Sequence, residues 1–163
     1  MNAPHNIGQL RELLSDFETA MLSSHTLSGQ MRSRPMHIAD VTEDGRIWFV
    51  CGAHSGKIDE FERDSRVAIV LQSSKRFVSI TGQAFLVEDP ERLAAMWKRA
   101  WSAWFPGGPE SAEIQLLAVR PEVAEFWDVS GAAGLRYAFA AAKALVTGER
   151  IDSEALEHGT MRL

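Results

Sequence analysis

The chain has 163 residues, of which 45% are hydrophobic and 24% are charged, and its formal net charge is −5. This length suits one domain with one core, and the composition is that of an ordinary soluble globular protein. The acidic balance disfavours binding to nucleic acid or to an anionic membrane, because both require a basic surface. We therefore expect a single domain over residues 1–163 with no nucleic-acid and no membrane partner.

The only cysteine, Cys51, excludes an internal disulfide and indicates a reducing compartment. The N-terminal segment contains no long apolar run, which disfavours a signal peptide or a membrane span. A cytoplasmic location is therefore expected.

Apolar spacing predicts a helix followed by a β-hairpin in the first third of the chain. Residues 8–21 have the spacing of an amphipathic helix. Residues 36–41 and 46–52 are typical of two strands joined by a turn in which Gly45 takes the positive φ. The residues that define the helix are Leu10, Leu13, Leu14, Phe17 and Met21.

The middle of the chain reads as a short helix and two strands. Residues 55–64 predict a helix with Ser55 as its N-cap. Residues 66–72 are a continuous apolar run typical of a buried strand. Residues 76–88 predict a long strand with a bulge or bend at Gly82.

The clearest helical pattern covers residues 89–105, with Asp89 as the expected N-cap. Residues 113–129 predict either a strand pair or one strand kinked at Pro121.

A helix over residues 131–147 and a loose tail over residues 148–163 complete the expected order. Several antiparallel strands with few helices between them indicate a mainly β protein with peripheral helices. We expect an antiparallel Greek-key barrel, built with its helices from residues 8–130.

A short run of small residues before Lys57 predicts a phosphate site. Gly56 allows close approach of a ligand, Ser55 precedes a helix start that favours an anion, and Lys57 adds positive charge. Arg34, on the preceding hairpin, has a planar guanidinium suited to phosphate. The alternative is that Ser55 only caps a helix and that both cations are solvated.

Other chemistry finds little support in the sequence. The glycine spacing is not that of a P-loop, and Cys51 lies in an apolar strand typical of a buried structural thiol. No residue is expected to act as a catalytic acid, base or nucleophile. No metal spacing is found among the histidines His5, His25, His37, His54 and His158.

The motifs "SRPM", "IWFVCGAHSGK", "FVSITGQAFLVED", "WKRAWSAWFPGG" and "LLAVRPEVAEFWD" follow one another in a familiar order. In this order the chain resembles the pyridoxamine 5′-phosphate oxidase-like superfamily of FMN-binding split β-barrels, over roughly residues 8–130. Within this superfamily, the branch that the chain most resembles is the general stress protein 26 group.

The resemblance implies a homodimer with two FMN sites at the subunit interface. It implies that Arg34, Ser55 and Lys57 hold the phosphate, and that Trp127 approaches the flavin from the other subunit. The implied cofactor-binding residues are Arg34, Met36, Phe49, Val50, Cys51, Ser55, Gly56, Lys57, Trp104, Phe105 and Trp127.

The chain departs from genuine pyridoxamine phosphate oxidases at three places. The run after Trp127 contains a single arginine, Arg136, where those enzymes have an Arg/His-rich run. The second basic residue at the end of the first hairpin strand is missing, and Ala39 or Asp40 stands near its place. Phe77 replaces the glutamine that usually begins the long strand near the flavin. We therefore expect a general stress-type FMN-binding protein, or an FMN-dependent oxidoreductase if it is an enzyme, without pyridoxamine phosphate oxidase activity. The alternatives are a non-catalytic flavin carrier or sensor, a cofactor-free dimeric interaction protein, and a protein that binds FAD or haem in the same cleft.

Overall fold

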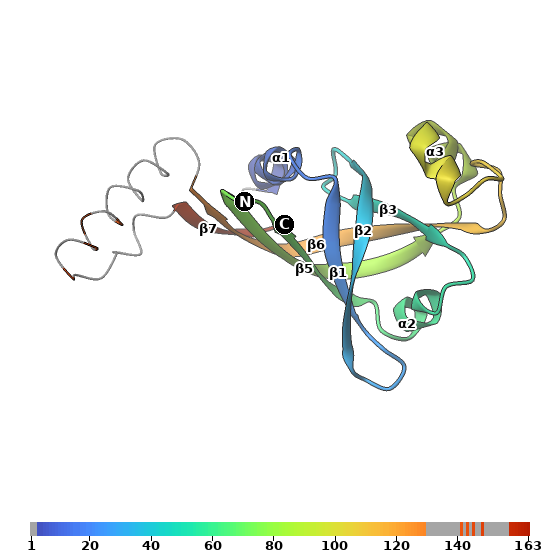
Figure 1. Ribbon diagram of the computed structural model, residues 1–163, viewed down its shortest axis with the longest axis horizontal. Coiled ribbons are helices and arrows are strands. Elements are labelled where there is room, and N and C mark those ends of the chain that lie inside the picture. Colours follow the sequence, from blue (N-terminus) through green and yellow to red (C-terminus); the bar gives the residue numbers. More distant parts are fainter. Residues whose placement is uncertain (1–2, 130–140, 142, 144, 146–147, 149–156) are drawn as a thin grey trace.

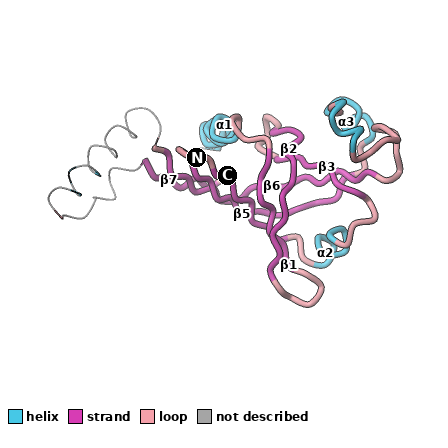
Figure 2. Tube along the Cα trace, viewed as in Figure 1, coloured by secondary structure: helices cyan, strands magenta, loops and turns pink. Residues whose placement is uncertain are grey.

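The computed structural model describes residues 3–129, 141, 143, 145, 148 and 157–163. Strands form the centre of the molecule and helices lie at its periphery (Figure 2). The helix expected over residues 131–147 lies almost wholly outside the described residues.

Among the described residues, seven strands form one antiparallel sheet in the order β3-β2-β1-β4-β5-β6-β7, and an additional β3–β6 pairing closes all but β7 into a barrel (Figure 1). This confirms the mainly β barrel expected from the sequence. The strands are β1 (Thr19–His25), β2 (Met31–Val41), β3 (Ile47–Gly52), β4 (Arg66–Gln72), β5 (Arg76–Val87), β6 (Ile114–Asp128) and β7 (Glu157–Arg162).

The helices are short and lie outside the barrel. They are α1 (Ala3–Leu14), α2 (Lys57–Arg63), α3 (Pro90–Met96) and a 3-10 helix, η1 (Arg99–Ala103). No helix among the described residues is long and apolar enough to cross a membrane.

The predicted helix over residues 8–21 is wrong beyond Leu14, because β1 begins at Thr19. Buried and more exposed residues alternate along β1, as in a strand that faces the core on one side. The alternation is hard to read in the sequence because the buried Ser24 is polar. The β2–β3 hairpin was expected, and Gly45 has the expected positive φ, at 83°.

The helical pattern over residues 89–105 is divided into two pieces. Asp89 caps α3 as expected and accepts a 2.9 Å hydrogen bond from the backbone N–H of Arg92. The helix α3 ends at Met96, since its C-cap residue Trp97 has a ψ of 128° that is not helical, and η1 follows. The break allows Trp97 and Trp101 to pack edge to face, with ring centroids 5.6 Å apart.

The prediction of a loose tail over residues 148–163 is wrong at its C-terminal end, because β7 pairs with β6 over six residues, Glu157 to Arg162. The strand β6 is continuous, which agrees with the alternative of one kinked strand. Its register with β5 shifts between Thr81 and Gly82, close to Pro121, so the expected bulge is present.

The bulge explains why position 82 is glycine. A Cβ atom at Gly82 would overlap the carbonyl oxygen of Arg120 on β6. We expect Gly82→Ala to lower the free energy of unfolding by about 1–3 kcal/mol, because the paired backbone must shift. The matched control is Gly8→Ala in α1, where an added Cβ meets nothing within 4 Å. Urea unfolding followed by tryptophan fluorescence measures both variants, and equal stability of the two would contradict this account.

Candidate functional site

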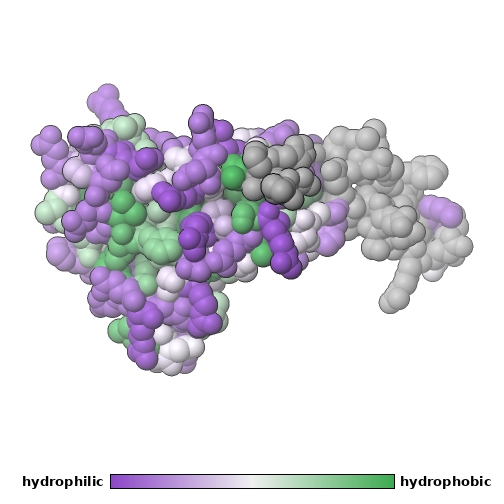
Figure 3. Space-filling view, turned by 180° about the vertical axis from the view of Figure 1, so that it is seen from behind, coloured by the Kyte–Doolittle hydropathy of each residue, from purple (hydrophilic) through white to green (hydrophobic). Residues whose placement is uncertain are grey.

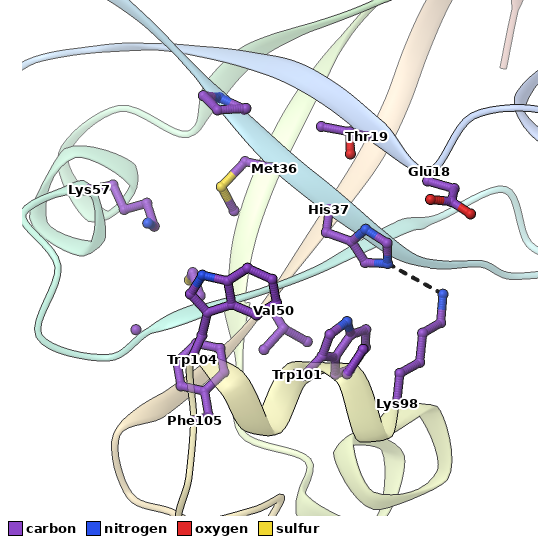
Figure 4. Close-up of a pocket in the computed structure, with 14 residues that line it drawn as sticks. Glu18, Thr19, Met36, His37, Val50, Lys57, Lys98, Trp101, Trp104 and Phe105 are labelled. Atoms are coloured by element: carbon purple, nitrogen blue, oxygen red, sulfur yellow. Dashed lines mark hydrogen bonds between the residues drawn. The ribbon is translucent and has the colours of Figure 1, made fainter.

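A cavity of about 780 Å³ lies against β2, β3 and η1 (Figure 4). Its walls are mostly apolar and aromatic, with a few charged side chains among them. The residues that line it are Glu18, Thr19, Pro35, Met36, His37, Val50, Cys51, Gly52, Lys57, Lys98, Ala100, Trp101, Trp104 and Phe105.

The strand period of β2 places side chains on the two sides of the barrel wall. Met36 and Ile38 belong to the hydrophobic core, and the intervening His37 points away from it. Both Met36 and His37 line the cavity. Opposite, η1 presents Trp101, which is only 6% exposed. Trp104 follows η1 and is 74% exposed at the cavity wall.

Lys57 lies at one end of the cavity, at the first residue of α2. The predicted N-cap role of Ser55 is wrong, since Gly56 occupies the N-cap position and no side chain caps the helix. The Ser55 hydroxyl is buried and has no hydrogen-bond partner within the described part of the chain. Gly56 has a helical φ of −56° and space for a Cβ atom, so the protein's own packing does not require glycine there.

Arg34 does not line this cavity, although the sequence places it with Lys57. Its guanidinium lies 2.6 Å from the carboxylate of Glu60 and donates a 3.1 Å hydrogen bond to the Ser24 hydroxyl. The Ser24 hydroxyl in turn donates to the same carboxylate at 3.0 Å, and Arg32 approaches it at 3.4 Å. Ser24, Arg34 and Glu60, the inner part of this cluster, join β1, β2 and α2, so the cluster holds the helix that begins with Lys57 in place.

The cluster makes the stability of the fold depend on pH. Burial raises the pKa of Glu60, but the hydrogen bonds from Arg34 and Ser24 and the charges of Arg34 and Arg32 together lower it below its ordinary value of 4.5. A carboxylate with a depressed pKa in the folded state stabilises the fold above its ordinary pKa, and this stability is lost as the pH falls through the folded-state pKa.

We therefore expect the free energy of unfolding to fall as the pH is lowered below about 4.5, with a smaller slope in Glu60→Gln than in the wild type. Urea unfolding at a series of pH values measures the slope. If both proteins lose stability equally steeply, Glu60 is not the source of the pH dependence.

His37 and Lys98 form a pair that sequence reasoning did not find. The Nε2 atom of His37 lies 3.4 Å from the Nζ atom of Lys98, and the His37 ring packs edge-on against Trp101 at 5.9 Å. Burial and the nearby Lys98 charge lower the pKa of His37, and Glu18 opposes the shift. Only the alternation of β2 signalled that His37 faces away from the core, and nothing in the sequence connects it to Lys98.

Cys51 lies in the cavity wall as a buried thiol, as expected. Burial raises its pKa to about 11, and the charge of Lys57 offsets this only in part. The thiol donates a 3.5 Å hydrogen bond to the backbone oxygen of Gln115. Since the thiolate is the reactive form, Cys51 is a poor nucleophile.

The chain matches the sequence profile of the pyridoxamine 5′-phosphate oxidase like family over residues 5–152. It belongs to this family. No curated protein matches the chain significantly in sequence.

Several solved structures share the fold of the chain. A protein of Jannaschia sp. CCS1 described as general stress protein 26 is 24% identical, with a TM-score of 0.71 over 98% of this chain and 97% of that one. The general stress protein 26 of Bacillus anthracis is 20% identical, with a TM-score of 0.65 over 77% of this chain and 94% of that one. The general stress FMN/FAD binding protein of Xanthomonas citri is 26% identical, with a TM-score of 0.63 over 76% of this chain and 87% of that one.

The cavity brings together about half of the residues that the family resemblance implied. Those that line it are Met36, Val50, Cys51, Lys57, Trp104 and Phe105. Those outside its lining are Arg34, Phe49, Ser55, Gly56 and Trp127, and Trp127 instead stacks on His158 at 4.9 Å. Their roles in flavin binding stay predictions. The described residues contain no cluster of metal-ligating side chains.

Proposed function

We propose that this member of the pyridoxamine 5′-phosphate oxidase-like family is a general stress-type flavin-binding protein that holds FMN in the cavity described above. The observation that carries the proposal is a large aromatic cavity with Lys57 at one end. The flavin binding named for the Xanthomonas citri protein supports it.

Lys57, at this end of the cavity, suits a phosphate group because it offers a positive charge. Ser55 stands two residues before it, outside the cavity lining, and its buried hydroxyl has no hydrogen-bond partner within the described part of the chain. A phosphate would satisfy both with charge-assisted hydrogen bonds. Arg34 is already paired with Glu60, so we assign phosphate recognition mainly to Lys57 and Ser55.

The rest of the cavity suits the planar ring system. Its volume of about 780 Å³ lies within the range of roughly 300–1,000 Å³ that small-molecule sites span. Val50 and Met36 offer apolar contacts, and Trp104 and Phe105 offer aromatic ones. Bound flavin supplies hydride- or electron-transfer chemistry, while these residues orient the ring and exclude water.

Within this proposal the chain is an FMN-dependent oxidoreductase if it turns over, and not a genuine pyridoxamine phosphate oxidase. FAD is the alternative flavin, and a carrier or sensor without turnover is the alternative role. Mixing the FMN-loaded protein with a nicotinamide donor distinguishes them: bleaching of the flavin absorbance supports an oxidoreductase, whereas stable absorbance supports a carrier.

We also propose a cytoplasmic homodimer. Apolar surface is exposed on one face of the molecule between hydrophilic residues (Figure 3). Met21 and Val70 are cross-strand partners on β1 and β4, and both are more than 40% exposed. A second copy of the chain would cover such a surface. Sedimentation equilibrium tests this, and a monomer at micromolar concentration would contradict it.

The proposed function is tested by the visible absorption of the purified protein and by titration with FMN and FAD. We expect a yellow protein or saturable micromolar binding of FMN. A colourless protein that binds neither flavin would overturn the proposal.

Trp104 provides a variant that separates ligand binding from folding, because its side chain is 74% exposed. We expect Trp104→Ala to weaken FMN binding about two- to tenfold, since a ring contact contributes about 0.5–1.5 kcal/mol. The matched control is Leu27→Ala, an exposed apolar side chain that does not line the cavity. Unchanged FMN affinity in Trp104→Ala would remove Trp104 from the site.

A further inference from the structure

The cavity has a second cationic end that the phosphate assignment does not use. Figure 4 places His37 and Lys98 on the side of the cavity away from Lys57, with the aromatic residues between the two ends. We propose that the His37–Lys98 pair binds the carboxylate of a second ligand, a small aromatic acid. This inference concerns a second ligand of the same cavity, and it rests on the proposed function only in taking FMN as the first ligand.

The two side chains are brought together by separate elements. His37 comes from β2 and Lys98 from the N-cap of η1, and their nitrogen atoms lie 3.4 Å apart. In the part of the chain that the structure describes, Lys98 forms no ion pair with a carboxylate. Its ammonium group has three donors, and His37 can accept one of them, so donors remain for an anion.

The surroundings favour an aromatic acid over a simple inorganic anion. The ring of Trp101 lies beside both members of the pair, with the Lys98 ammonium 5.8 Å from its centroid and the His37 ring at 5.9 Å. Trp104 and Phe105 extend the aromatic wall towards the Lys57 end. A planar ring with one carboxylate would place its charge at Lys98 and its face or edge against the Trp101 indole, which leaves Trp104 and Phe105 to the flavin.

Binding of a carboxylate should be linked to uptake of a proton. The groups that face His37 are Lys98, whose charge lowers the pKa of the imidazole, and Glu18, which raises it. A carboxylate beside Lys98 would offset the lysine charge and raise the pKa of His37 towards or above its ordinary value of 6.5. The protonated imidazole could then donate a second hydrogen bond to the anion, so affinity should increase as the pH falls from 8 to 6.

Benzoate is the probe, and benzamide is the neutral control of the same shape. Titrations followed by tryptophan fluorescence give the dissociation constants, and the NMR signal of the His37 ring gives its pKa with and without benzoate. We expect benzoate to bind more tightly than benzamide and to raise the pKa of His37. Lys98→Gln should weaken benzoate binding by about tenfold or more, because a charge-assisted contact is lost. The matched control, Lys75→Gln, changes a lysine outside the cavity lining and should have no effect.

Three results would each overturn the inference: no saturable benzoate binding, equal affinity for benzoate and benzamide, or unchanged benzoate affinity in Lys98→Gln. The flavin titration is read separately. A protein that binds FMN but not benzoate contradicts this inference alone. A protein that binds benzoate at His37 and Lys98 but binds no flavin contradicts the proposed function and leaves the carboxylate site standing.

Discussion

Replacing Arg34 with alanine is expected to lower the free energy of unfolding by about 3–5 kcal/mol. The Arg34 side chain is 16% exposed and lies 2.6 Å from the carboxylate of Glu60, which is 5% exposed. Removing the guanidinium leaves a buried carboxylate and the buried Ser24 hydroxyl without this partner, and the cost of burying a charge is then no longer offset.

The matched control for this prediction is Arg32→Ala. Arg32 approaches the same carboxylate at 3.4 Å, but its side chain is 63% exposed, so solvent screens the interaction. Its loss is expected to cost at most about 1 kcal/mol. Urea unfolding of both variants at pH 7 measures the difference. Equal destabilisation by the two substitutions would show that Arg34 is not an internal structural partner of Glu60.

Replacing Lys57 with alanine is expected to weaken FMN binding about ten- to hundredfold, which corresponds to about 1.5–3 kcal/mol for one charge-assisted contact. Riboflavin has the same ring system and lacks the phosphate, so its affinity should change little. The cost to folding should also be small, because Lys57 forms no ion pair within the described part of the chain.

Parallel titrations of the wild type and the variant with FMN and riboflavin measure this effect. The control is Lys75→Ala, which removes the same charge from the turn between β4 and β5, outside the cavity lining. A loss of affinity that is equal for FMN and riboflavin would show that Lys57 acts on the ring or on the shape of the cavity, and not on the phosphate.

These two predictions separate roles that the sequence joins. The resemblance assigns Arg34 and Lys57 to one phosphate, whereas the structure pairs Arg34 with Glu60 and leaves Lys57 at the cavity. A double replacement of both arginine and lysine would therefore mix a loss of stability with a loss of ligand affinity. Single replacements, each with its matched control, avoid this.

Much of the barrel could be predicted from local patterns. The turn at Gly45, the apolar run of β4 and the glycine bulge of β5 each have a signal within a few residues. Strands β1 and β7 were missed for a different reason: β1 buries a serine, and β7 contains His158 and Gly159, so neither shows the usual apolar alternation. Their pairing with β4 and β6 makes them strands, and pairing is not a local property.

The candidate site depends even more on contacts between distant residues. Lys57 could be proposed from its own short motif. The partner of Arg34, Glu60, is 26 positions away, and Lys98 is 61 positions from His37. Because these contacts join β2 to α2 and β2 to the start of η1, reading the residues in order does not show that Arg34 is already paired or that His37 has a cationic neighbour.

The most direct measurement of the central claim is a crystal structure of the protein with FMN. The account predicts the flavin in the cavity between β2, β3 and η1, with its phosphate within hydrogen-bond distance of Lys57 and the Ser55 hydroxyl, and with the Arg34–Glu60 pair intact. A flavin bound elsewhere, or a phosphate held by an Arg34 that has left Glu60, would contradict it.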